Sequence, residues 1–200
     1  MSDVYISPSS QHFNTGYGNY GVEERRMNLI ADVVQYELER AGVSTDRNDP
    51  DMTLTEIVAD SNSKSPKIHV AIQSQSADTM QRGVQIYYYK PGSNGERLAS
   101  DIFTYLSPLT EVEDIGLSDG SQVYGGLGFY ELRRTRAPAV IVMVGYHDNP
   151  LDADFIIDNT YEIGVAIAKG ILEYLGVPYT EDSEDNINRQ KADYNGVIFQ

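Results

Sequence analysis

The chain has 200 residues, 30 acidic against 15 basic side chains, and a formal net charge of −15. That length suits one domain with a sizeable core, and the negative charge disfavours nucleic acid and anionic polymers as partners. Because the sequence contains no cysteine, disulfides, thiol catalysis and thiolate metal sites are excluded.

No apolar run approaches the roughly 18 residues of a membrane span, so none is expected. The first residues lack a basic stretch followed by an apolar one, which predicts no secretory signal and a protein that is cytoplasmic as synthesised. Release by lysis or through a dedicated export apparatus is compatible with this expectation.

The first half of the chain alternates predicted strands with predicted helices. Apolar residues recur at helical spacing through 23–41, and Glu23 and Glu24 open this helix where its dipole favours negative charge. Ser93 and Glu96 have the spacing of a capping box at the start of a later helix. The predicted strands are 4–6, 43–47, 68–72 and 83–89, and the predicted helices are 23–41, 53–62 and 95–106.

The second half contains the most apolar stretch of the chain. Residues 139–144 form a continuous apolar run between Pro138 and Gly145, which is typical of a strand buried on both faces. Residues 107–128 lack periodicity and predict a long surface loop, 129–132 a short strand, and 151–159 and 161–175 helices. The alternation predicts a single three-layer α/β domain with a mostly parallel central sheet flanked by helices.

We place this domain at residues 1–178 and a polar, acidic tail at 179–200. The tail ends in an apolar segment, residues 197–199 (VIF). Two readings follow: a stray hydrophobic terminus, or a segment that docks on its own domain or on a neighbouring copy.

Several local patterns resemble a known family. They are residues 24–29 (ERRMNL), 83–89 (GVQIYYY), 130–140 (YELRRTRAPAV), 145–150 (GYHDNP) and the helix at 164–170. In this order they resemble the zinc-dependent N-acetylmuramoyl-L-alanine amidases, which cleave the bond between glycan and stem peptide in bacterial peptidoglycan. The resemblance covers nearly the whole domain and implies the amidase fold.

The resemblance also implies where a zinc site belongs. The family holds zinc with a histidine after the first strand, a glutamate opening the first helix and a second histidine on a later strand, and a further glutamate is the general base. Here those positions fall on Ser10, Glu24, Gln73 and Met143. Hydroxyl and amide oxygens are poor zinc ligands, and methionine accepts no proton. We therefore expect no cofactor and no catalytic residue, with zinc only if this alignment is wrong.

The same positions outline a possible ligand pocket, made of Ser10, Gln11, Glu24, Gln73, Tyr146 and His147. His12 is a candidate for a displaced ligand, although a loop histidine is the plainer reading. His69 alternates with Gln73 on one strand and either faces the site edge or is satisfied in the core.

Three hypotheses follow. The first is a catalytically inactive amidase homologue, a pseudoenzyme that either binds peptidoglycan fragments or serves as a structural, self-associating subunit. The second is a divergent active amidase that hydrolyses the muramoyl–L-alanine amide bond. The third is a structural protein that self-assembles into a homo-oligomer or filament.

Overall fold

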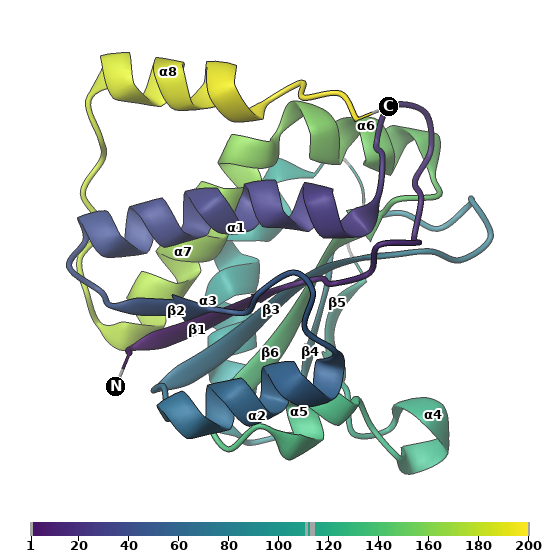
Figure 1. Ribbon diagram of the computed structural model, residues 1–200, viewed down its shortest axis with the longest axis vertical. Helices are drawn as coiled ribbons and strands as arrows, with labels where there is room; N and C mark the ends of the chain where they lie inside the picture. The colour runs from purple at the N-terminus through teal and green to yellow at the C-terminus, as the bar shows by residue number, and fades with distance from the viewer. Residues whose placement is uncertain (1, 111, 113–114, 200) are drawn as a thin grey trace.

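A computed structural model describes residues 2–110, 112 and 115–199. Figure 1 shows a single domain built around one central sheet. Its strands are β1 (Val4–Pro8), β2 (Thr45–Arg47), β3 (Ile68–Gln75), β4 (Gln85–Tyr88), β5 (Gly116–Asp119) and β6 (Ala139–Tyr146). Its helices are α1 (Glu23–Arg40), α2 (Leu54–Lys64), α3 (Asn94–Leu106), the 3-10 turn η1 (Ser107–Leu109), α4 (Val123–Gly126), α5 (Tyr130–Arg134), α6 (Pro150–Asp158), α7 (Thr160–Leu175) and α8 (Glu184–Tyr194).

The six strands lie in the order β2-β1-β3-β6-β4-β5. Neighbours pair in parallel except β4, which runs antiparallel to β6. The sheet is therefore mostly parallel, as the alternation of strands and helices predicted. Figure 1 shows α1 on one side of the sheet and α2 with α5 on the other, which confirms the three-layer architecture.

Strand β6 fills the centre of the fold, and all of its residues are buried. Val140, Val142 and Val144 belong to the large core shared with α1, α3 and α7. Ile141 and Met143 point to the opposite face, into a smaller apolar cluster beneath α5. The two faces explain why this strand reads as a continuous apolar run rather than as an alternation.

Three segments differ from expectation. Residues 107–128 contain η1, β5 and α4 rather than a structureless loop, and β5 is fixed by pairing with β4, which leaves no apolar periodicity. Residues 129–132 enter helix α5 instead of a strand. The predicted tail contains α8, whose Ser183 caps the Asn186 N–H and whose first turn carries Glu184 and Asp185. A polar helix of this kind gives no apolar stripe to detect.

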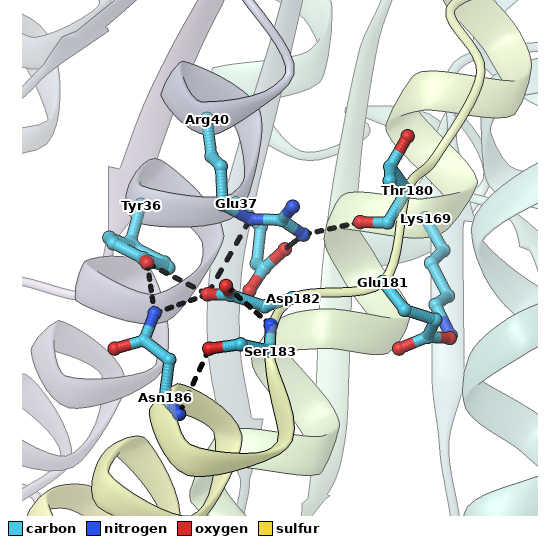
Figure 2. A network of polar contacts seen from close by, with 9 residues as sticks. All are labelled: Tyr36, Glu37, Arg40, Lys169, Thr180, Glu181, Asp182, Ser183 and Asn186. Atoms are coloured by element: carbon cyan, nitrogen blue, oxygen red, sulfur yellow. Dashed lines mark hydrogen bonds and ion pairs between the residues drawn. The ribbon is translucent and has the colours of Figure 1, made fainter.

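The C-terminal strap, residues 179–199, is tied to α1 and α7 (Figure 2). The Tyr36 hydroxyl donates to Asp182 over 2.8 Å, and Arg40 donates to the Thr180 carbonyl over 2.7 Å. Lys169 of α7 forms an ion pair of 3.0 Å with Glu181. These contacts hold the strap against the same helices that cover the large core.

The end of the strap docks on its own domain. The fully buried Arg26 donates to the Val197 carbonyl over 2.8 Å, and its guanidinium carbon lies 4.7 Å from the centre of the Phe199 ring. Of the two readings of the apolar terminus, docking on the same chain is the arrangement seen. Across the parts of the chain that the structure describes, no helix has the length and apolarity to cross a membrane.

Helices α3 and α7 cross in close contact at Gly170. A Cβ built on Gly170 lies 2.3 Å from the Ile102 Cα and 2.7 Å from the Ile102 nitrogen. Both neighbours are backbone atoms, so a side chain at position 170 requires the helices to separate.

We expect Gly170→Ala to lower the free energy of unfolding by about 1–3 kcal/mol, since overpacking outweighs the gain in helix propensity. Urea denaturation measures this change. The control Glu173→Ala removes an exposed side chain of the same helix and should change stability little. A stabilised Gly170→Ala protein would contradict the close crossing.

Candidate functional site

The candidate site is a cavity of about 180 Å3 at the carboxyl ends of β1 and β3. Ser7, Ser10 and Gln11 line it from β1 and the following loop, and Gln73 lines it from β3. The other side of the cavity is closed by residues of α2, of α4, of α5 and of the segment that joins α4 to α5. Among them are Leu54, Tyr124, Phe129 and Glu131. We call this space the polar cavity. Its position matches the edge where parallel α/β sheets hold their ligands.

Glu131 of α5 is the most connected residue of the polar cavity, and its side chain is almost entirely buried. Its Oε1 accepts a hydrogen bond of 2.6 Å from the Ser7 hydroxyl and lies 2.8 Å from Nε2 of His69. Its Oε2 is 3.4 Å from the Gln73 amide nitrogen. These donors come from β1 and β3, so the carboxylate links α5 to two neighbouring strands.

His69 continues this network into the core. Its Nδ1 lies 2.9 Å from the Ser61 hydroxyl of α2, and its ring stacks on Tyr5 with centroids 5.2 Å apart. Ser61 and His69 are fully buried. Ser61, His69 and Glu131 are thus linked by successive hydrogen bonds. Because Ser61 is buried in the core, where no substrate reaches it, this arrangement has a structural role. His69 is a satisfied core residue, one of the two readings its alternation with Gln73 left open.

Gln73 and Met143 are direct partners in the β3–β6 register. The Gln73 amide turns toward Glu131. The Met143 side chain is buried in the small apolar cluster, with Ala71, Leu132 and Ile141. The two positions that the resemblance assigns to a zinc ligand and a general base are therefore adjacent, and neither side chain offers a proton acceptor or an imidazole.

Glu24 lies elsewhere, at a larger outer cavity of about 580 Å3 that it shares with His12, Arg25 and Phe199. Its Oε1 accepts a hydrogen bond of 2.9 Å from Asn28, and its Oε2 is 3.7 Å from Nδ1 of His12. The other His12 nitrogen is 3.5 Å from Asp51. Glu24 is thus held by neighbours of its own helix and loop.

Tyr146 and His147 stabilise loops. The Tyr146 hydroxyl donates to Gln81 over 3.0 Å. Nδ1 of His147 lies 2.8 Å from the Ser74 hydroxyl, which is 2.7 Å from the hydroxyl of Tyr20. Burial lowers the pKa of His147, and the nearby carboxylates of Glu23 and Asp148 oppose that shift.

The structure thus brings Ser10, Gln11 and Gln73 into one cavity and places Glu24, Tyr146 and His147 outside its lining. Sequence reasoning missed Ser7 and Glu131. The available signal was His69, which alternates with Gln73 on a buried strand and so required a polar partner on that face. The partner lies 62 residues away in the chain, and no local pattern identifies it.

The donor set does not fit a zinc centre. Zinc sites in proteins use imidazole, thiolate and carboxylate ligands, whereas Ser10 and Gln73 offer a hydroxyl and an amide, and the Gln73 nitrogen faces Glu131. Within residues 2–110, 112 and 115–199, no group of three or more histidine, cysteine, aspartate or glutamate side chains is arranged to hold a metal ion. That the chain binds no zinc stays a prediction, which rests on the chemistry of these donor groups.

Comparison with known proteins establishes the class. Residues 4–173 match the family model described as N-acetylmuramoyl-L-alanine amidase. Because this match covers most of the chain, the chain belongs to the N-acetylmuramoyl-L-alanine amidase family. Among curated proteins, it is 27% identical over 179 residues to the uncharacterized protein YqiI of Bacillus subtilis (strain 168), a match that covers 86% of this chain and 84% of that protein.

Solved structures share the fold. The catalytic domain of CwlV, an N-acetylmuramoyl-L-alanine amidase from Bacillus (Paenibacillus) polymyxa var. colistinus, superposes with a TM-score of 0.77 at 23% identity, over 89% of this chain and 100% of that one. The N-acetylmuramoyl-L-alanine amidase AmiC2 of Nostoc punctiforme gives 0.74 at 24% identity, over 86% and 96%. The amidase fold predicted from the sequence is confirmed.

The lowered pKa of His147 predicts how the stability of the folded protein changes with pH. The folded protein resists protonation of this imidazole, whereas the unfolded chain takes up a proton near the ordinary histidine pKa of about 6.5. The stability contributed by neutral His147 is therefore present above that pH and is lost as the pH falls below it.

We expect the wild type to lose more unfolding free energy than His147→Gln when the pH is lowered from about 7.5 to about 5. Urea denaturation at both pH values measures this difference. His12→Gln is the matched control, because the His12 side chain is 42% exposed. An equal pH response of the wild type and His147→Gln would show that His147 is not held neutral by burial.

Proposed function

We propose that this chain is a catalytically inactive member of the amidase family that binds peptidoglycan fragments in the polar cavity. The observation that carries the proposal is the adjacent pair Gln73 and Met143 on β3 and β6. Hydrolysis by the family requires an activated water and a base that removes its proton. An amide turned toward Glu131 and a buried thioether supply neither function.

Binding without hydrolysis is supported by the cavity itself. It lies at the carboxyl ends of β1 and β3, the edge where parallel α/β sheets bind their ligands, and it combines hydroxyl, amide and aromatic groups. Such a mixture of polar contacts and aromatic walls suits amphipathic ligands such as peptides attached to sugars.

Two rival functions remain to be separated from this proposal. A divergent active amidase requires a bound metal and a proton acceptor near the scissile bond. Self-assembly through the apolar terminus requires Val197 and Phe199 to leave Arg26 of the same chain, on which they pack. The binding proposal requires neither a bound metal nor a displacement of the C-terminal segment.

The test is incubation of the purified chain with purified peptidoglycan, with and without added zinc, followed by sedimentation and by an assay for newly released amino groups. We expect the protein to sediment with the polymer and to release no peptide in any condition. Release that needs zinc and stops with a chelator would establish the active amidase instead. A protein that stays in the supernatant would contradict the binding role.

A matched pair of tyrosines locates the binding surface. Tyr124 lines the polar cavity, whereas Tyr17 is a similarly exposed tyrosine outside its lining. We expect Tyr124→Ala to weaken binding of peptidoglycan fragments about fivefold, the effect of about 1 kcal/mol of lost aromatic contact. Tyr17→Ala should bind like the wild type. Equal affinities for all three proteins would place the binding surface elsewhere.

A further inference from the structure

The polar cavity carries a single charged side chain. Of the residues that line it, Glu131 is the one with a carboxyl group, and no lysine, arginine or histidine is among them. The Glu131 side chain is 3% exposed, so the carboxylate lies in a small, poorly hydrated space. A cavity of this kind attracts positive groups and repels negative ones.

The carboxylate retains capacity to accept hydrogen bonds. Its Oε1 is shared by the Ser7 hydroxyl and His69. Its Oε2 has only the 3.4 Å contact with the Gln73 amide, whereas a carboxylate offers about four acceptor positions. Within the described parts of the chain, the one basic side chain recorded against the carboxylate is His69, through Oε1, and no lysine or arginine forms an ion pair with it. A hydrogen-bond donor entering from the cavity therefore finds an acceptor at Oε2.

The walls of the cavity suit a cation as well. Phe129 and Tyr124 meet edge to face with ring centroids 5.6 Å apart, and both line the space in which Glu131 lies. Aromatic faces attract ammonium groups, more strongly where water is displaced. Tyr124 adopts a left-handed backbone conformation, with φ of 52°, which is uncommon for a residue other than glycine and orients this wall.

We propose that the polar cavity takes a primary ammonium group, with Glu131 as its counter-ion. Ser7 and His69 hold Oε1 and fix the orientation of the carboxylate, while Oε2 accepts the ligand N–H. This inference rests on the proposed binding of peptidoglycan fragments, and it names the part recognised: a stem peptide whose diamino-acid residue has a free side-chain amine. The Gln73 amide is displaced from Oε2 or shares it with the ligand.

The experiment compares two stem tripeptides that end in L-lysine. One has a free side-chain amine, and in the other that amine is acetylated, which removes the positive charge. Nα-acetyl-L-lysine methylamide, with and without side-chain acetylation, serves as a probe for the amine alone. Calorimetry measures the peptides, and amide chemical shifts in NMR detect the weaker small probe.

We expect the wild type to bind the free-amine peptide at least about tenfold more tightly than the acetylated one, because a charge-assisted hydrogen bond is lost. Glu131→Gln should bring the two affinities within about twofold of each other. Glu173→Gln removes the same charge from an exposed position of α7 and should leave the difference intact. The comparison of peptides uses wild-type protein, so it stands even if Glu131→Gln fails to fold.

The outcomes separate this inference from the proposed function. Equal binding of both peptides by the wild type would overturn the amine site and leave peptidoglycan binding in place. Binding of the free-amine probe, lost on acetylation, with neither peptide bound would support the amine site and overturn the proposed function. Absence of binding by every compound would overturn both.

Discussion

A carboxylate buried beneath a helix must be surrounded by donors, and in this protein Glu131 imposes that constraint. Leaving its charge unpaired would cost several kcal/mol. Ser7, His69 and Gln73 meet the requirement from two strands. Helix α5 is thereby fixed over β1 and β3, and the gap between the helix and the strand ends becomes the polar cavity. The Glu131 side chain therefore positions a helix, carries the buried carboxylate and lines the candidate site.

The two faces of the sheet have separate tasks. One face is an apolar core with α1, α3 and α7, reinforced on its outer side by the C-terminal strap. The other carries the Glu131 network and the small cluster that contains Met143. The first face holds the large apolar cluster and the second only a small one, so we expect substitutions of polar residues on the second face to change the fold's stability less. The proposed inactivity concerns residues of the second face, such as Gln73 and Met143, whereas the fold that the family shares does not by itself decide activity.

The sequence was most informative where burial is periodic. The continuous apolar run of β6 and the stripes of α1 and α7 predicted the layers, and residues read by alternation, such as His69 and Gln73, lie on the expected face. It gave no signal where structure comes from pairing or polar docking. Strand β5 forms by pairing with β4, and α8 docks through polar contacts of Asn186 with Tyr36 and of Lys191 with Glu162. Glu131 was missed because its partners are distant in the chain, and its neighbours Arg133 and Arg134 resemble a solvated turn.

The central claim is that a polar network has replaced a metal centre, and elemental analysis of untreated protein tests it most directly. The protein is purified without chelators or metal-affinity steps, and zinc is measured per chain. The account predicts zinc far below one ion per chain. Zinc near one per chain would contradict it, and would mean that Glu24 forms a site with a histidine such as His12, whose Nδ1 already lies 3.7 Å from the Glu24 carboxylate, or His147.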